Sequence, residues 1–235
     1  MTVVRQPVVL RDADVWFPPP DQALKKPNGL LAIGGDLSPR RLLAAYAQGI
    51  FPWFNDADGP ILWWSPDPRA VIMPDALKIS RSLRRRLARG DLRVTFDCAF
   101  GDVVDGCAGP RDGAGGTWIT PSMRGAYREL HRLGYAHSAE SWLGDQLVGG
   151  LYGISLGRMF FGESMFARVS DASKVAFARL AARLAQWQFE IIDCQVMNPH
   201  LHSLGAFDVS RSEFLARLRN NPIDGTRLGS WHIDE

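Results

Sequence analysis

Residues 159–206 constrain the fold of this chain most, because their pattern changes from strand to helix and back to strand. The segment begins as an apolar strand, passes through the polar turn ARVSDAS, and continues as a helix to about Gln188. A short apolar strand, IIDCQ, follows at once. Polar side chains stand at the ends of these elements, where a fold places chemistry more often than core: Glu163, Asp193, Gln195 and Asn198.

The composition indicates an ordinary globular protein of a reducing compartment. Of its 235 residues 46% are hydrophobic, which suffices for a core, and the formal net charge is only +2. A nucleic-acid contact therefore needs a local cluster of Lys and Arg. Cys98, Cys107 and Cys194 show no metal-binding spacing, and their odd number argues against a disulfide framework. The N-terminus has no long apolar run, so we expect a cytoplasmic protein without an export or membrane segment.

We expect two domains, a small one over residues 1–66 and a larger one over residues 67–235. The small one is rich in Pro, Gly and Trp and holds one clear helix, with Ser38 as its N-cap, Pro39 in its first turn and Gly49 as its stop. Stiff and large side chains cluster around residue 66, which suggests a domain junction there.

The larger region alternates helices and strands in an order similar to the acetyltransferase-like α/β arrangement, a mixed sheet with helices on both faces. Three successive strands are expected between residues 135 and 166, followed by the long helix from Ser170 or Asp171 and the buried strand 191–195. The other expected elements are strands at 71–74 and 92–96, helices at 79–90, 97–109, 121–133 and 211–218, and a Gly-rich loop at 110–118.

The loop before the long helix argues against coenzyme A as an acyl carrier. Coenzyme-A users of this arrangement place a Gly-rich loop there, so that backbone N–H groups at the helix start hold pyrophosphate. Here the loop has no glycine, and the charge of Asp171 repels phosphate.

A basic run over residues 78–93 indicates a nucleic-acid contact instead. It holds seven Lys or Arg side chains against the single acid Asp91. On a helix most of them share the side opposite Leu83 and Leu87, a spacing that suits a phosphate backbone. The alternative is the solvated face of a surface helix, and neither interpretation implies that a base sequence is recognised.

Six blocks of sequence span nearly the whole chain. They are PNGLLAIGGDLSPRRLLAAYAQGIFPWF (27–54), ILWWSPDPRAVI (61–72), GTWIT (116–120), FGESMF (161–166), ASK (172–174) and IDCQVMNPHLHSLGA (192–206). Together, and in this order, they resemble the leucyl/phenylalanyl-tRNA-protein transferase family. The resemblance implies transfer of Leu, Phe or, less readily, Met from aminoacyl-tRNA to an N-terminal Arg or Lys of a protein, which marks that protein for N-end-rule degradation. It also implies a small N-terminal domain packed on an acetyltransferase-like C-terminal domain.

The resemblance places the catalytic residues of the family at Asp193 and Gln195. An aminoacyl ester is already activated, so its attack by an amine needs placement of two reactants, which contributes ~7–11 kcal/mol, and help with one proton. The carbonyl oxygen of Gln195 can accept a hydrogen bond from the attacking amine. Asp193 lies two residues back on the same strand face and can orient that amide. The alternative is that Asp193 only satisfies backbone donors at a strand end.

The resemblance also gives binding roles to residues that the sequence pattern alone assigns to packing or to the surface. The pocket for the transferred side chain maps to four apolar positions, which periodicity alone places in the core: Leu151, Met165, Phe177 and Leu180. Four further positions map to the terminal adenosine, the ester and the amino group: Trp53, Trp118, Glu163 and Asn198. On the basic helix, Arg81, Arg84 and Arg85 are the candidates for contact with the tRNA backbone.

Two other classes of function remain open on the sequence. Cys194, His200 or His202, and Asp193 have the residue types of a cysteine hydrolase, but a regular strand points Cys194 away from Asp193 and Gln195. A noncatalytic RNA-binding module uses the basic helix and the tryptophans and leaves the Asp/Gln pair structural. No cofactor is expected and no metal site, because His200 and His202 lack further clustered ligands. A monomer is the default.

Overall fold

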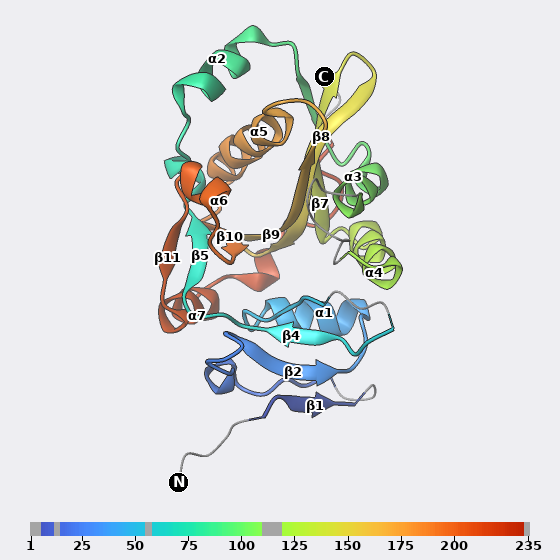
Figure 1. Cartoon of the computed structure of the whole chain (residues 1–235), viewed down its shortest axis with the longest axis vertical. Helices are drawn as coiled ribbons and strands as arrows, with labels where there is room; N and C mark the ends of the chain where they lie inside the picture. Colours follow the sequence, from blue (N-terminus) through green and yellow to red (C-terminus); the bar gives the residue numbers. More distant parts are fainter. Residues whose placement is uncertain (1–5, 12–14, 55–57, 110–118, 233–235) are drawn as a thin grey trace.

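A computed structural model describes residues 6–11, 15–54, 58–109 and 119–232 of the chain. Its helices and strands form a small N-terminal domain and a larger domain, each built around its own sheet (Figure 1). The larger domain has helices on both faces of a mixed sheet, so the expected α/β fold class is confirmed. The last strand of the first sheet ends at Trp64 and the first strand of the second begins at Arg69, while the exact boundary at residue 66 stays a prediction.

The N-terminal sheet has the strand order β1-β2-β4-β3. Its strands are β1 (Val8–Leu10), β2 (Leu30–Gly34), β3 (Phe51–Pro52) and β4 (Leu62–Trp64), with the 3-10 turn η1 (Pro20–Gln22) before β2. These strands have two to five residues, too few for a clear hydrophobic pattern, and the sequence predicts only the helix of this domain. That helix, α1 (Pro39–Tyr46), begins as predicted, because the Ser38 hydroxyl accepts a hydrogen bond from the Arg41 backbone N–H.

The second sheet has seven strands in the order β11-β5-β10-β9-β8-β7-β6. They are β5 (Arg69–Ile72), β6 (Arg93–Phe96), β7 (Ala136–Leu143), β8 (Gln146–Leu156), β9 (Met159–Ala167), β10 (Ile191–Gln195) and β11 (Phe207–Val209). The strands β7, β8 and β9 form an antiparallel meander, and β10 then pairs with β9 in parallel. The long helix between β9 and β10 provides the crossover that such a parallel pair requires.

Helices cover both faces of this sheet. On one face lie α3 (Phe100–Ala108) and α4 (Pro121–Arg132), and on the other lies α5 (Ala172–Gln186) with α2 (Arg81–Arg89) beside it (Figure 1). The remaining helical elements are α6 (Pro199–Ser203), α7 (Arg211–Arg219), η2 (Pro74–Ala76) and η3 (Ile223–Gly225). The predicted helices all form, whereas α6, β11 and the short 3-10 turns have no counterpart among the predicted elements. The predicted loop 110–118 lies outside the described residues.

The start of α5 differs in detail from the sequence interpretation. Asp171 occupies the N-cap position with a left-handed φ of 64°, and its side chain makes no capping hydrogen bond. The carboxylate instead accepts a hydrogen bond from Lys174 Nζ at 2.9 Å. The acid at this helix start is therefore part of a local ion pair, and the loop still places a negative charge where a pyrophosphate would bind.

Candidate functional site

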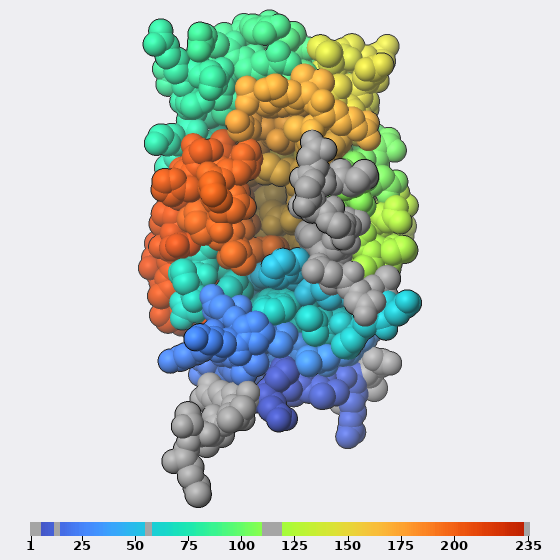
Figure 2. Space-filling view, viewed as in Figure 1, coloured from blue at the N-terminus to red at the C-terminus, as the bar shows by residue number. Residues whose placement is uncertain are grey.

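A cavity of about 340 Å³ opens between the N-terminal domain, α5 and α6 (Figure 2). Both domains line it, since Phe51, Pro52 and Trp53 come from the first and the remaining lining residues come from β8, β9, α5, β10, the turn after β10 and α6. Three of the four polar residues that the sequence places at element ends line it: Glu163, Gln195 and Asn198. The volume lies within the range of small-molecule sites, and a concave apolar wall with a few polar groups is typical of them.

Glu163 is the polar centre of the cavity wall. Its carboxylate accepts hydrogen bonds from the hydroxyls of Tyr46 at 2.7 Å and Tyr127 at 2.5 Å, and from Gln195 Nε2 at 2.9 Å. Burial is the main cause that raises the pKa of Glu163, and the nearby Asp193 charge adds to it, whereas the two tyrosine hydrogen bonds and the Arg69 charge lower it. The resulting pKa is about 7. Near neutral pH this carboxyl therefore exists in both protonation states.

Asp193 lies outside the cavity lining and is fully buried. Its two oxygens accept hydrogen bonds from Arg69, from Nε at 2.8 Å and from Nη2 at 2.6 Å. The Oδ1 atom also accepts from the backbone N–H of Gln195 at 2.9 Å. The hydrogen bond to the Gln195 N–H thus joins the Asp193 carboxylate to a residue of the cavity wall.

The end of β10 is irregular, which corrects the sequence-based geometry. The pairing with β5 shifts by one residue between Asp193 and Gln195, and Gln195 has a left-handed φ of 63°. Strand alternation consequently fails here: Gln195 lines the cavity while the Asp193 side chain does not, and Cys194, which a regular strand points away, also lines the cavity.

Cys194 lacks the features of a nucleophile. Its thiol donates to the carbonyl oxygen of Ile192 at 3.7 Å, and burial raises its pKa far above the usual value, with the Asp193 charge adding to the effect. His200 lines the cavity as well, but no hydrogen bond joins it to Cys194 in the described part of the chain. This geometry argues against the cysteine-hydrolase interpretation.

The predicted side-chain pocket is present with one exception. Leu151, Met165 and Phe177 line the cavity, whereas Leu180 is buried in the core beneath α5. Ile192, which the sequence interpretation left out, completes this apolar wall. Leu180 lies on the same face of α5 as Phe177, but about 4.5 Å further along the helix axis, beyond the lining of the cavity.

The remaining predicted contacts surround this pocket. Asn198 lines the cavity and caps α6, because its Oδ1 accepts from the Leu201 backbone N–H at 2.9 Å. Trp53 is 42% exposed at the cavity edge, and its ring lies 5.7 Å from that of Trp64. Trp118 lies outside the described residues.

The basic helix α2 lies at the end of the molecule opposite the N-terminal domain (Figure 1). Arg81, Arg84 and Arg85 are exposed on it, and among the described residues none of the three forms an ion pair. Arg86 and Arg89, by contrast, both pair with Asp91. Within the described part of the chain, the arginines of α2 without an ion pair are therefore the same three that the sequence interpretation selected.

Three site residues were missed in the sequence: Tyr46, Tyr127 and Arg69. Each side chain is buried, and the two tyrosines bind Glu163 in the cavity wall while Arg69 binds Asp193 behind it. Tyr46 and Tyr127 occur at the buried positions of predicted amphipathic helices, which sequence reasoning assigns to packing. A charged residue at the start of the apolar strand β5 is the one signal that could have drawn attention to Arg69.

The described ranges contain no group of three or more His, Cys, Asp or Glu side chains that could hold a metal ion. No helix within these ranges is both long and apolar enough to cross a membrane.

Comparison with known proteins agrees with the resemblance seen in the sequence. The family model described as leucyl/phenylalanyl-tRNA protein transferase matches residues 71–219, and the model described as the N-terminal domain of that transferase matches residues 35–67. The leucyl/phenylalanyl-tRNA–protein transferase of Azoarcus sp. (strain BH72) is 58% identical over 92% of this chain and 91% of that protein. The protein of the same name from Stutzerimonas stutzeri (strain A1501) is 57% identical over 94% of this chain and 97% of that protein. Among solved structures, the C-terminal domain of a putative lysylphosphatidylglycerol synthetase from Agrobacterium fabrum covers 84% of this chain and 74% of that chain, with a TM-score of 0.44 and 10% identity.

Proposed function

This chain belongs to the leucyl/phenylalanyl-tRNA protein transferase family of aminoacyltransferases, and from that premise we propose the reaction that its cavity performs. The enzyme moves Leu or Phe, and less readily Met, from aminoacyl-tRNA to an N-terminal Arg or Lys of a protein. The modified protein then enters N-end-rule degradation. We further propose that the enzyme works in the cytoplasm as a monomer.

The observation that carries this proposal is an apolar wall and a polar amide in one cavity. Leu151, Met165 and Phe177 supply the wall, and Gln195 supplies the amide. A methionine side chain adapts its shape, so a wall of this kind accepts aromatic side chains as well as aliphatic side chains without a branch at Cβ. An aminoacyl group seated on this wall has its ester carbon within the same cavity as the amide.

The proposed chemistry is direct attack of the acceptor amine on the ester carbon. The N–C bond forms, the C–O bond to the ribose breaks, and the proton lost by the amine is taken up by the departing ribose oxygen. No covalent intermediate with the enzyme is needed, because the ester is already activated and placement supplies much of the rate enhancement.

Gln195 is the proposed catalytic residue. Its Nε2 donates to Glu163, so its carbonyl oxygen is left to accept a hydrogen bond from the attacking amine. Asp193 acts on this amide through the Gln195 backbone. Glu163 is proposed to contact the substrate amino group from the cavity wall while it holds the Gln195 side chain.

The tRNA is proposed to contact the protein at the cavity edge and at α2. Trp53, with Trp118, offers an aromatic surface to the terminal adenosine, and stacking of one base contributes ~1–3 kcal/mol. Asn198 binds the ester or the ribose. Arg81, Arg84 and Arg85 contact the phosphate backbone without selecting a base sequence.

The decisive experiment weighs the product. The protein is incubated with Leu-tRNA or Phe-tRNA and a peptide beginning with Arg, and mass spectrometry should find the peptide heavier by one Leu or Phe residue. The matched control is the same peptide beginning with a small neutral residue, which should stay unmodified. Binding of the tRNA without any product would overturn the proposal and favour a noncatalytic RNA-binding module.

A further inference from the structure

We propose that Arg69 is a positioning residue for the transfer reaction, because it fixes Asp193 and, through Asp193, the backbone turn that presents the Gln195 amide. The inference rests on the proposed function of Gln195. It assigns to the Asp193 carboxylate the role of a hydrogen-bond anchor and gives it no part in proton transfer.

Arg69 is held from every side by described residues. It is 1% exposed, and its guanidinium makes the two hydrogen bonds to Asp193 with Nε and Nη2. Its Nη1 donates to the carbonyl oxygen of Gly49 at 3.2 Å. The guanidinium also lies 4.7 Å from the ring centres of both Phe51 and Phe214. A planar guanidinium between two rings, with a bidentate carboxylate, has a single orientation.

That orientation joins three parts of the chain. Gly49 and Phe51 belong to the N-terminal domain, Phe214 to α7, and Asp193 to the end of β10. Gly49 suits its place because it has a φ of +71°, and a Cβ there would lie 2.8 Å from Leu215 Cδ2 on α7. The N-terminal domain and α7 thus contribute to catalysis through their contacts with Arg69, and of Gly49, Phe51 and Phe214 only Phe51 also lines the cavity.

The link from Asp193 to Gln195 is a single backbone hydrogen bond. Asp193 Oδ1 accepts the Gln195 N–H at 2.9 Å, and Gln195 has the left-handed φ of 63° that is unusual for a residue with a side chain. The β-bulge interrupts the regular pairing of β10 with β5 at this point. The Gln195 N–H therefore depends on a hydrogen-bond partner outside that pairing. Arg69 holds that partner, Asp193, in the orientation in which its Oδ1 accepts the N–H.

Arg69→Gln tests the proposal directly. We expect kcat for transfer to fall about 100-fold, the loss expected from a misplacement of about 1 Å, while KM for aminoacyl-tRNA stays within a factor of about three of the wild-type value. Arg41→Gln is the matched control, since Arg41 is equally buried and pairs with Asp36 at 3.1 Å within the N-terminal domain. The control should lose thermal stability and keep its kcat. A folded Arg69→Gln variant with near-normal kcat would overturn the proposal.

The double variant Arg69→Gln/Asp193→Asn separates anchoring from a role of the charge. The oxygen of the introduced asparagine can still accept from the Gln195 N–H, its amide nitrogen can donate to the introduced glutamine, and no buried charge is left unpaired. We expect its kcat to recover to within about tenfold of the wild type, whereas Asp193→Asn alone should stay as slow as Arg69→Gln. A folded double variant that remains as slow as Arg69→Gln overturns the proposal, because the negative charge itself is then required.

Two further measurements keep the result interpretable. Arg69→Lys retains the charge but not the two-point contact, so it should fold and show an intermediate kcat, and it carries the test if Arg69→Gln fails to fold. Wild-type protein is assayed in parallel with Phe-tRNA and the Arg-initiated peptide. Absence of product in the wild type refutes the proposed function, whereas an effect confined to the variants concerns only Arg69.

Discussion

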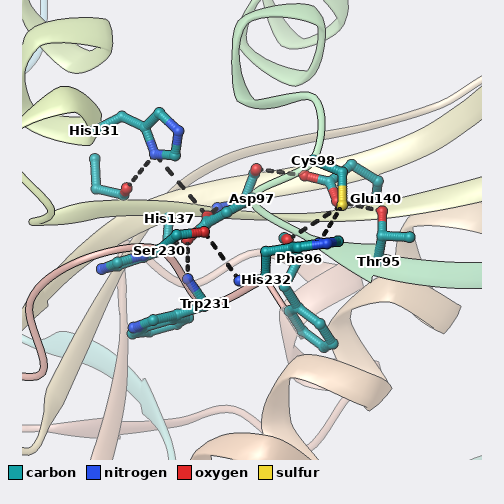
Figure 3. Close-up of polar contacts among 12 residues, drawn as sticks. Thr95, Phe96, Asp97, Cys98, His131, His137, Glu140, Ser230, Trp231 and His232 are labelled. Carbon is teal, nitrogen blue, oxygen red and sulfur yellow. Dashed lines mark hydrogen bonds and ion pairs between the residues drawn. The ribbon is translucent and has the colours of Figure 1, made fainter. Parts of the chain in front are cut away.

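Two buried polar clusters of this molecule are built from similar parts and differ in what lies next to them. The cavity cluster comprises Tyr46, Arg69, Tyr127, Glu163, Asp193 and Gln195. The C-terminal cluster comprises Asp97, His137, Ser138 and Trp231 (Figure 3). Each contains a buried carboxylate with several donors and an ionisable group whose pKa is displaced by burial. Of the two, the cavity cluster is the one that borders the open cavity.

The C-terminal cluster holds the segment around Trp231 against the large sheet. Asp97 accepts hydrogen bonds from the backbone N–H groups of Ser138 at 2.9 Å and Trp231 at 2.6 Å, and from His137 Nδ1 at 2.9 Å. The His137 ring stacks on the Trp231 indole with 3.7 Å between ring centres, and Trp231 is 2% exposed. Burial lowers the pKa of His137 although Asp97 raises it, so the ring is neutral at pH 7 and closed off by the indole.

A displaced pKa and a dense hydrogen-bond network therefore do not by themselves identify a functional site. Both clusters have these features, and structural networks perturb titrating groups as active sites do. What distinguishes the cavity cluster is room for a reactant beside Glu163 and Gln195. Substitutions in the cavity cluster should therefore remove activity, and those in the C-terminal cluster should remove stability.

Gln195→Ala should have the largest effect on activity. Loss of its amide removes the proposed hydrogen bond to the attacking amine, and kcat should fall by ~10²–10³-fold. The free energy of unfolding, measured by urea denaturation followed by circular dichroism, should change little, because Gln195 is only half-buried.

Gln146→Ala serves as the matched control, since Gln146 is an exposed glutamine in the same sheet and lies away from the cavity. Its turnover and stability should both equal those of the wild type. Near-normal turnover of Gln195→Ala would remove the catalytic assignment and, with it, the contrast between the two clusters.

Trp231→Ala should have the largest effect on stability. It removes a buried indole and uncovers His137, and such a change costs about 3–5 kcal/mol of unfolding free energy. At a temperature where the variant is still folded, its kcat should be close to that of the wild type. Leu228→Ala is the control, because Leu228 belongs to the same segment and is 53% exposed. A folded Trp231→Ala variant with a strongly reduced kcat would show that the C-terminal cluster is coupled to the reaction.

The two clusters should also respond to pH in opposite directions. Glu163 has a pKa raised to about 7 in the folded protein, so the native state binds more protons than the unfolded one, and its contribution to stability is lost as pH rises from about 4.5 to about 7. His137 has a lowered pKa, so its contribution is present above pH 6.5 and is lost as pH falls below that value.

Urea denaturation of Glu163→Gln and His137→Gln across about pH 5–8 measures these contributions by difference from the wild type. Relative to the wild type, Glu163→Gln should gain stability as pH rises, and His137→Gln should gain stability as pH falls. If both variants instead gained stability relative to the wild type in the same direction of pH, burial would not be the main cause of the pKa shift of one of these two residues. The kcat of the wild type should rise through about pH 7, because ionised Glu163 holds Gln195 Nε2 more firmly, and Glu163→Gln should lose this dependence.

Local signals explain what the sequence could predict. The N-cap Ser38 accepts the predicted backbone hydrogen bond, because capping depends on residues three positions apart. Ser80, Thr120 and Ser210 make the same contact at the starts of α2, α4 and α7. Gln195 and Asn198 could be selected for the same reason, since Gln195 ends β10 and Asn198 caps α6, whereas Glu163 lies in the middle of β9 and not at the predicted strand end.

Long-range and irregular features could not be predicted in this way. The partners of Glu163 come from residues 46 and 127, and those of Asp193 from residue 69, so only the folded chain brings them together. The β-bulge at Cys194 has no signal in an apolar strand pattern, and it decides which side chains face the cavity. Leu180 was assigned to the pocket by the resemblance alone, whereas its helical periodicity placed it in the core, where the structure has it.

The arginines of α2 belong to neither cluster, so they should change affinity without changing turnover or stability. Single substitutions of Arg81, Arg84 and Arg85 by Ala should each weaken tRNA binding a few fold and reduce the slope of log affinity against log salt by roughly 0.9 per lost phosphate contact. Filter binding of Phe-tRNA at several salt concentrations measures that slope. Arg132→Ala is the control, because Arg132 is 69% exposed on α4 and already paired with Glu129. A slope that stays the same in all three variants means that α2 presents a solvated face, and tRNA contact must then be sought nearer to the cavity.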